Sequence, residues 1–237
     1  MTSLGVGYAP FSKLERLVID IEQKLNSESL KKNCPWMGSD IKIMGTRQSQ
    51  RFSITLCIPQ IAKYVQTIDD YKNNLEQAEK IIYKISRNLG INDLELSYNT
   101  RDNLKTKELY LTAIGSSIES GDEGLVGRGN RINGVISPTR LMSMEGACGK
   151  NPVYHIGKIY YVAANEISKK IYKKFGVENE VSLVSQSGRD LLDPWKTFVT
   201  LFNSDVNKKQ VKIFVEEEIK KIPKITRDLL KNKLKLF

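Results

Sequence analysis

The stretch from Gly115 to Gly149 constrains the fold most, because it interrupts the hydrophobic periodicity of the chain. It contains eight glycines among few apolar residues, and neither a helical nor a strand period runs through it. A loop of this length inside a compact chain is usually functional. We therefore expect two layered domains, residues 1–118 and residues 119–237, with the glycine-rich loop near the start of the second.

The part before this stretch alternates between helix and strand patterns. Apolar residues recur at helical spacing over Leu14–Leu25, and Ser12 with Glu15 predicts a capping box at its start. A longer helix is predicted from about Thr67 to Leu89, ended by Gly90. Period-two patterns predict strands over Asp40–Met44, Phe52–Ile58, Leu94–Tyr98 and Leu109–Ile114. This order predicts an α/β or α+β layer.

The part after the loop repeats the same coarse order. A helix is predicted with Asn151 as N-cap and Pro152 as first residue, running to Gly176. Further elements are expected over Val181–Val184 (strand), Phe198–Phe202 (strand), Val211–Val215 (a strand, or a helix continuing to Ile222) and Arg227–Leu236 (a helix after a break at Pro223).

The positive charge is concentrated at the C-terminus. The net charge is +10, and residues 206–237 carry ten basic and four acidic side chains, which leaves +6 there. Such a tail fits either a nucleic-acid or anionic surface, or a solvated lysine-rich helix. We favour the solvated helix, because Phe214 and Phe237 are the only aromatic residues available for base stacking.

Composition excludes several other classes of protein. With 40 % apolar and 27 % charged residues, the chain is not wholly disordered. The sequence has neither an apolar run long enough to cross a membrane nor a secretory signal, so we expect a cytoplasmic protein without a membrane partner. Three cysteines without a CxxC pair argue against a disulfide framework or zinc knuckle, and the single histidine excludes chemistry that needs two imidazoles.

The segment Gly121–Arg131 is the first candidate site. Its glycines free backbone N–H groups to face an anion, and Arg128 and Arg131 supply forked cationic donors. The segment is neither a P-loop nor a Rossmann fingerprint. Its residues fit either a phosphate-binding loop or a wide surface turn.

The segment Gly149–Lys158 is the second candidate. Lys150 directly precedes the predicted helix start, where free N–H groups and the helix dipole favour an anion. His155 and Lys158 are three residues apart and are expected to share a helix face. The alternative is a packed core histidine and an ordinary surface lysine.

Residues 121–165 as a whole closely resemble the signature of archaeal-type S-adenosylmethionine synthetases (methionine adenosyltransferases), and SLGVGYAPFSKLERL resembles another segment of that family. The resemblance implies three similar sheet-plus-helix units around a pseudo-threefold axis, of which this chain would supply two. It also implies formation of S-adenosylmethionine from ATP and L-methionine in one-carbon metabolism, Mg²⁺ and in many members K⁺ as cofactors, and dimers with sites between subunits.

The resemblance also implies roles for individual residues. Arg128, Lys150 and His155 would be catalytic, and Asp122 and Tyr154 would bind methionine. The residues that would bind ATP or its triphosphate are Asp122, Gly127, Arg128, Arg131, Gly146, Lys150 and Lys158. No metal ligand is assigned.

Some positions depart from the family pattern. Gly129 and Tyr154 stand where bacterial members have lysine, and Arg131, His155 or Lys158 are candidates to replace those charges. The family's GHPD motif, whose His and Asp serve catalysis and metal binding, does not occur in this sequence. We therefore expect the C-terminal part of a synthetase, acting as a homodimer or with a complementing N-terminal chain. A non-catalytic paralogue that regulates a full-length synthetase is the alternative, and nucleic acid is not an expected partner.

Overall fold

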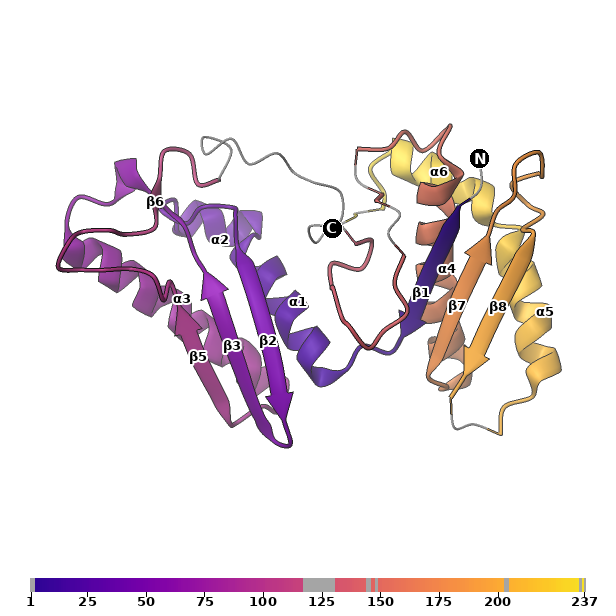
Figure 1. The fold of residues 1–237 in the computed structure, drawn as a ribbon, viewed down its shortest axis with the longest axis horizontal. Helices are drawn as coiled ribbons and strands as arrows, with labels where there is room; N and C mark the ends of the chain where they lie inside the picture. The colour runs from indigo at the N-terminus through magenta and orange to yellow at the C-terminus, as the bar shows by residue number, and fades with distance from the viewer. Residues whose placement is uncertain are drawn as a thin grey trace. The chain divides into compact units, whose positions relative to one another are not determined.

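The computed structural model describes residues 3–116, 131–143, 146–147, 149–202, 205–234 and 236 (Figure 1). They form two compact units. We call residues 12–116 the central unit. Residues 3–11, together with the described residues from 131 onward, are the C-terminal unit. The chain is mixed α/β with several small sheets, as the sequence predicts.

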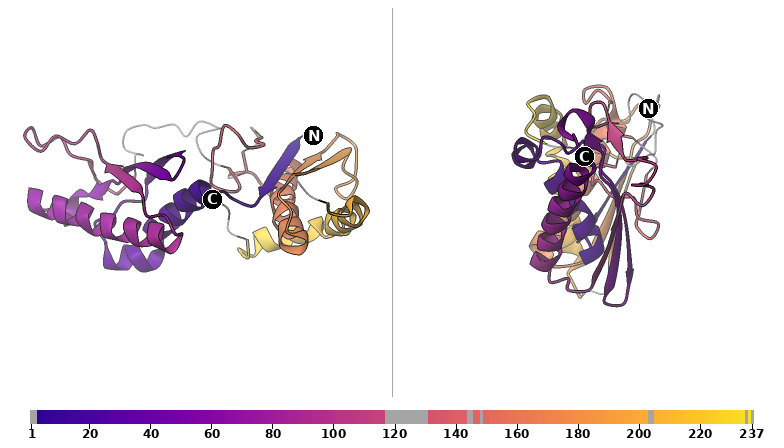
Figure 2. Two further views of the ribbon diagram at one scale, coloured as in Figure 1. Left: turned by 90° about the horizontal axis from the view of Figure 1, so that it is seen from below. Right: turned by 90° about the vertical axis from the view of Figure 1, so that its left-hand side faces the viewer.

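The central unit is a three-stranded sheet, in the order β2-β3-β5, with helices on one face (Figures 1 and 2). Strands β2 and β3 are antiparallel, and β3 and β5 are parallel. The elements of this unit are α1 (Lys13–Leu25), α2 (Glu28–Asn33), β2 (Lys42–Gln48), β3 (Arg51–Cys57), β4 (Gln60–Ile61), the 3₁₀ helix η1 (Ala62–Tyr64), α3 (Ile68–Asn88), β5 (Leu94–Tyr98) and β6 (Leu111–Thr112).

Predictions for the two long helices of this unit are confirmed. Ser12 and Glu15 form the capping box of α1, Thr67 caps α3, and Gly90 follows α3 with a φ of +66°. The predicted strand over Leu109–Ile114 is much too long, since only Leu111 and Thr112 pair, with β4. The short elements α2 and β4 escape the periodicity argument because too few residues define their period.

The C-terminal unit also has a three-stranded sheet, in the order β1-β7-β8, and here all neighbours are antiparallel. Helix α4 packs along β1 and β7 on one face (Figure 1). The elements are β1 (Leu4–Ala9), α4 (Ile156–Phe175), β7 (Asn179–Val184), β8 (Lys196–Leu201), α5 (Lys208–Ile219) and α6 (Ile222–Leu230).

Strand β1 corrects the predicted division of the chain into domains. The sequence places residues 1–118 in one domain, but Leu4–Ala9 pairs residue by residue with Val184–Asn179 and so belongs to the C-terminal unit. Local pattern could not show this, because the paired residues lie 170 to 180 positions apart in the sequence. The other predicted boundary, at residues 118 and 119, lies outside the described residues.

Two glycines bring β1 against α4. A Cβ atom on Gly5 would lie 2.2 Å from the backbone carbon of Tyr160, and one on Gly7 would lie 2.4 Å from the backbone oxygen of Ala164. Strand and helix therefore meet backbone to backbone, which requires glycine at both positions.

Three helix boundaries in this unit differ from prediction. Helix α4 begins at Ile156, not at Pro152. The segment Val211–Val215 is helical, in agreement with the helical one of its two predicted alternatives, but α5 ends at Ile219 and not at Ile222. Helix α6 begins at Ile222, so Pro223 lies in the first turn of a helix that was expected to start after it. A proline fits there because first-turn N–H groups have no partner within the helix. None of the described helices is long and apolar enough to span a bilayer.

Candidate functional site

The N-terminus of α4 differs from the starts of the other α-helices in the described part of the chain. A side chain caps each of α1, α2, α3 and α5, and α6 has a proline in its first turn. His155 occupies the N-cap of α4 without a capping hydrogen bond from its side chain. Among the described residues nothing accepts from the N–H groups of Ile156 and Gly157. A 20-residue helix thus presents free donors and the positive end of its dipole.

Asn151 does not cap this helix, contrary to the prediction. Its side-chain Oδ1 accepts from the N–H of Val153 (2.8 Å), and its carbonyl oxygen accepts from the N–H of His155 (3.0 Å). Residues 151–154 therefore form a turn that leads into the helix. The same local hydrogen bonding that makes Asn a good N-cap also makes it a good turn former, so the sequence could not distinguish the two.

Lys150 and Lys158 are brought together by this turn. The Nζ of Lys158 donates to the carbonyl oxygen of Lys150 at 2.7 Å, and both residues are half-buried. Lys158 is the third residue of α4, whereas His155 precedes the helix, so the predicted shared helix face is wrong. The bond uses one of the three donors of the Lys158 ammonium and fixes Lys150 beside the open helix end.

His155 is neither an ordinary core residue nor a surface residue. Its side chain is partly exposed, but its Nδ1 atom is buried and has no hydrogen-bond partner among the described residues. Tyr154, predicted to bind methionine, is 79 % exposed. Nothing in the described residues holds the Tyr154 side chain over the helix end.

Arg131 and Gly146 lie in the segments that precede this turn. Arg131 is 3 % exposed and lies near Tyr161 of α4. Burial raises the pKa of Tyr161, and the positive charge of Arg131 opposes that shift. Ala147, next to Gly146, packs with Val6 and Tyr161 in a small cluster. Tyr161 was missed from sequence, because its position in a helix of periodic apolar residues indicates only core.

The remaining predicted residues, Asp122, Gly127 and Arg128, lie outside the described residues. The structure therefore brings together Lys150, Lys158 and the start of α4, and it places Arg131 against α4. It does not test the roles predicted for individual residues.

The basic tail has a structural role. Ile222 of α6 is buried, while Ile225 and Leu229 pack against the cluster that contains Val6 and Ala147. Thr226 Oγ1 donates to the carbonyl oxygen of Pro152 at 3.4 Å. Helix α6 therefore contacts the turn before α4 and helps to hold it in place.

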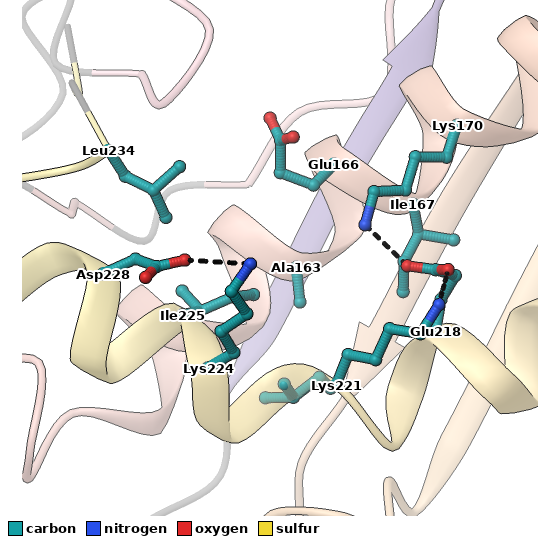
Figure 3. A pocket seen from close by; sticks show the side chains of 11 residues that line it. Ala163, Glu166, Ile167, Lys170, Glu218, Lys221, Lys224, Ile225, Asp228 and Leu234 are labelled. Atoms are coloured by element: carbon teal, nitrogen blue, oxygen red, sulfur yellow. Dashed lines mark hydrogen bonds and ion pairs between the residues drawn. The ribbon is translucent and has the colours of Figure 1, made fainter.

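A groove of about 220 Å³ lies between α4 and the helices α5 and α6 (Figure 3). Glu218, whose side chain is 5 % exposed, accepts from Lys170 (2.6 Å) and from Lys221. Burial would raise the pKa of Glu218, but hydrogen bonds and charge from the two lysines hold it below its ordinary value. The spacing of Val211, Val215 and Glu218 already places this carboxylate on the apolar face of α5.

The described residues contain no cluster of three or more His, Cys, Asp or Glu side chains that could hold a metal ion. Mg²⁺ usually binds to one or two carboxylates together with substrate phosphates, so a dedicated protein cage is not its normal site.

Comparison with known proteins identifies the family to which this chain is similar. The family model described as S-adenosylmethionine synthetase matches residues 1–233. A probable S-adenosylmethionine synthase of Aquifex aeolicus is 41 % identical over 234 residues, which cover 97 % of this chain and 58 % of that protein. The S-adenosylmethionine synthase of Archaeoglobus fulgidus is 39 % identical over 243 residues, covering 100 % and 61 %.

The fold agrees with this result. The structure of an unusual S-adenosylmethionine synthetase from Campylobacter jejuni matches with a TM-score of 0.60 at 15 % identity, covering 91 % of this chain and 56 % of that one. At this identity the match shows similarity of fold alone. The chain spans about 60 % of the length of the curated relatives it matches.

Proposed function

This chain belongs to the archaeal type of the S-adenosylmethionine synthetase family, and on that premise we propose that it is the C-terminal part of a methionine adenosyltransferase. The reaction joins ATP and L-methionine to S-adenosylmethionine and releases phosphate and pyrophosphate. We propose a cytoplasmic location, as the family resemblance implies. The two units, each a three-stranded sheet with helices on one face, would be two of the family's three.

The observation that carries this proposal is the uncapped start of α4 beside Lys150 and Lys158. In the proposed reaction the methionine sulfur attacks C5′ of the ribose, and the C5′–O bond to triphosphate breaks. A thioether is neutral and needs no general base, so the difficulty lies in the charge that gathers on the leaving triphosphate. Fixed cations and oriented N–H groups stabilise such a charge, and the end of α4 supplies both.

In our proposal, the residues around this helix end bind the triphosphate from two sides. Lys150 and the free N–H groups of α4 bind the triphosphate from one side, and Arg128 with Arg131 binds it from the other. Mg²⁺, with K⁺ as a possible second cation, would neutralise part of the triphosphate charge when bound. Lys158 positions Lys150 through its hydrogen bond to the Lys150 carbonyl.

A substitution at the N-cap tests the role of the helix end. His155→Asp would cap α4 and stabilise it by about 1 kcal/mol, yet it would place a carboxylate where the triphosphate is proposed to bind. We expect calorimetric titration with tripolyphosphate to show at least a tenfold loss of affinity. His155→Asn, a neutral cap, is the matched control and should lose less. Equal affinity of His155→Asp and wild type would contradict the proposed site.

Arg128 offers a second test in the glycine-rich segment. Removing its charge-assisted pair by Arg128→Ala should weaken tripolyphosphate binding by about 1.5–3 kcal/mol. Lys231→Ala, in the equally basic tail, should change it by less than about 1 kcal/mol, because an exposed single charge contributes little. Equal losses would indicate diffuse charge attraction rather than a site.

Activity should require the GHPD motif, which these 237 residues do not contain. We expect the purified chain to form no detectable S-adenosylmethionine, because the His and Asp of the GHPD motif do not occur in it. Clear magnesium-dependent product from the pure chain would contradict this expectation. A complementing chain that contains GHPD should restore turnover.

Uncovered residues support a protein partner. Met44 on β2 and Phe198 on β8 are 68 % and 57 % exposed. A homodimer or a complementing N-terminal chain would cover them. The alternative function is that of a non-catalytic subunit that regulates a full-length synthetase. It predicts that the chain binds such a synthetase, and that adding a complementing chain with GHPD yields no product.

A further inference from the structure

Arg131 and Lys150, on the two sides of the proposed triphosphate site, lie in segments without regular structure. The described residues between 131 and 155 contain no helix and no strand. The backbone hydrogen bonds described within these segments close local turns, such as the bond from the N–H of Gly134 to the carbonyl of Arg131 at 3.0 Å. Pairing between strands therefore does not set the distance between the two cations, and packing against other elements must do so.

Helix α6 contacts the segment that carries Lys150. The Oγ1 of Thr226, in this helix, donates to the carbonyl oxygen of Pro152 at 3.4 Å. Pro152 lies in the turn after Lys150, and the same turn is closed by the bond from the N–H of His155 to the carbonyl of Asn151. Through this turn, the contact with Thr226 reaches the start of α4.

The same helix packs on the segments that precede this turn. Ile225 and Leu229 pack against the cluster that contains Ile132, the residue after Arg131, and Ala147. Both side chains also pack against the larger core cluster around α4, β7 and α5. They therefore join the regular core of the unit to the irregular segment that carries Arg131.

Helix α6 is itself firmly attached to the core. Its N-cap residue is Lys221, and Glu218 accepts from Lys221 and from Lys170 of α4 (Figure 3). Ile222, its first residue, is buried. Because the start of α6 is fixed to α4 and α5, the rest of the helix offers a fixed surface to the segments that pack on it.

We propose that Leu229 and Thr226 are positioning residues of the triphosphate site, and that α6 sets the distance between Arg131 and Lys150. Charge-assisted hydrogen bonds depend on geometry, so a displaced cation binds the anion less tightly even though α6 does not touch it. This inference rests on the proposed function, whose site it concerns. It gives the basic C-terminal region a role that depends on apolar packing and not on its charge.

Calorimetric titration with tripolyphosphate tests this role, at a temperature where circular dichroism shows each variant to be folded. We expect Leu229→Ala to lower the affinity about tenfold, within the range by which substitutions remote from a site change binding. The matched control is Leu230→Ala, the next residue of the same helix, which is 60 % exposed and should leave the affinity unchanged. Leu229→Met conserves the side-chain volume and should restore wild-type affinity.

The single histidine of the chain gives a second test that needs no anion. Because His155 is alone, its imidazole NMR signals are assigned directly, and they report on the start of α4. Leu229→Ala and Thr226→Val should both shift these signals, and Leu230→Ala should not. Thr226→Val removes only a hydroxyl and keeps the shape of the side chain, so it serves even if Leu229→Ala does not fold. It should weaken tripolyphosphate binding about threefold, as expected for one lost neutral hydrogen bond.

Two results would overturn the proposal. One is a Leu229→Ala chain that loses stability but binds tripolyphosphate like wild type, because α6 would then serve stability alone. The other is a set of His155 signals that move in neither variant. If the wild-type chain did not bind tripolyphosphate, the proposed function would fail instead, and the His155 signals would still show whether α6 positions the start of α4.

Discussion

The two units share one architecture and differ in how completely their polar groups are satisfied. Each has a three-stranded sheet with helices on one face. In the central unit, α1 and α3 begin with capping boxes, and a buried side-chain network closes around Tyr71. In the C-terminal unit, α4 begins uncapped, and buried atoms such as His155 Nδ1 and Ser168 Oγ have no partner among the described residues.

Within one fold, the satisfied polar groups of the central unit serve stability, whereas the unsatisfied ones of the C-terminal unit mark the place where we propose a function. Unmade hydrogen bonds at buried positions cost free energy, so they persist where something other than stability selects them. Apolar patterning and caps are sufficient to form the central unit. In the C-terminal unit a close glycine contact holds a long helix in place, and the start of that helix has no side-chain cap, which fits the anion site that we propose there.

The largest effect should come from breaking the contact between β1 and α4. Gly5→Val would place a Cβ 2.2 Å from the Tyr160 backbone, which cannot move without displacing the helix. We expect a loss of more than about 3 kcal/mol in the C-terminal unit, the upper end for overpacking. Hydrogen exchange should show this loss in α4 and β7 and leave α3 protected.

Gly176→Ala is the matched control for that substitution. A Cβ at Gly176 meets nothing within 4 Å, and only its φ of +68° opposes a side chain. The cost should be about 1–2 kcal/mol. If Gly5→Val cost no more than Gly176→Ala, the close contact would not be what holds the unit together.

This contact also shows the limit of sequence reasoning about the fold. The capping boxes and periods of α1 and α3 are local signals, and they gave both helices to within a residue or two. The pairing of β1 with β7 is not local, and Gly5 and Gly7 resemble loop residues in the sequence. A segment whose structure is decided by a distant partner offers no period to detect.

The buried network around Tyr71 is where the central unit can be tested. The Tyr71 hydroxyl donates to Asp102 Oδ2 (2.5 Å) and accepts from Asn99 Nδ2 (2.9 Å) and from the Tyr110 N–H (3.2 Å). Tyr71→Phe should cost about 1–3 kcal/mol, because buried partners lose a hydrogen bond. Chemical denaturation with exchange at β3 and α3 would measure it.

Tyr83→Phe, on the same helix, is the control and should stay within about 0.5 kcal/mol of wild type. Among the described residues the hydrogen bond made by Tyr83 outside the helix backbone uses its carbonyl oxygen, which accepts from Ser86 Oγ, and not its hydroxyl. An equal effect of the two changes would mean that the network adds nothing to the stability of the central unit. The contrast in polar satisfaction between the two units would then not explain their stability.

A smaller effect is expected at Glu218, where the C-terminal unit does satisfy a buried charge (Figure 3). Glu218→Gln should cost about 1–2 kcal/mol near neutral pH, since Lys170 and Lys221 are about half exposed and the pair is partly screened. Glu216→Gln, an exposed control on the same helix, should cost less than about 1 kcal/mol.

The pH dependence of that cost has a definite sign. The lysines lower the pKa of Glu218 in the folded state below its ordinary 4.5. Its stabilisation is therefore complete above about that pH and is lost as pH falls through the folded value. The difference between wild type and Glu218→Gln should vanish in acid, and a difference that persisted there would exclude the ion pairs as its cause.

The candidate site was predicted less completely than the fold. The sequence singled out Lys150, His155 and Lys158 as a group, and the structure does join Lys150 to Lys158. It placed the helix start four residues early, because Asn151-Pro152 satisfies the rules for a helix start and for a turn equally well. Tyr161 was missed, since a tyrosine in an apolar helix period carries no separate signal.

The last prediction concerns Lys31 in the central unit, a charged side chain that is partly buried. Its Nζ donates to the carbonyl of Met37 (3.1 Å) and to that of Gly38. Burial lowers the pKa of Lys31 to about 8, although the nearby Glu22 and Cys34 act in the opposite direction. Between pH 8 and the ordinary value of 10.5, the unfolded chain binds more protons at this site than the folded chain. Its contribution to the free energy of unfolding should therefore rise with pH across that range.

Lys31→Met should remove this rise, and subtracting the two pH profiles cancels the titration of the other lysines and tyrosines. The ¹³Cε chemical shift of Lys31 gives the pKa directly, with the variant identifying the signal. If that signal titrates at the ordinary pKa, the Lys31 ammonium is solvated in solution. The hydrogen-bonded packing of the central unit would then not include this charged side chain.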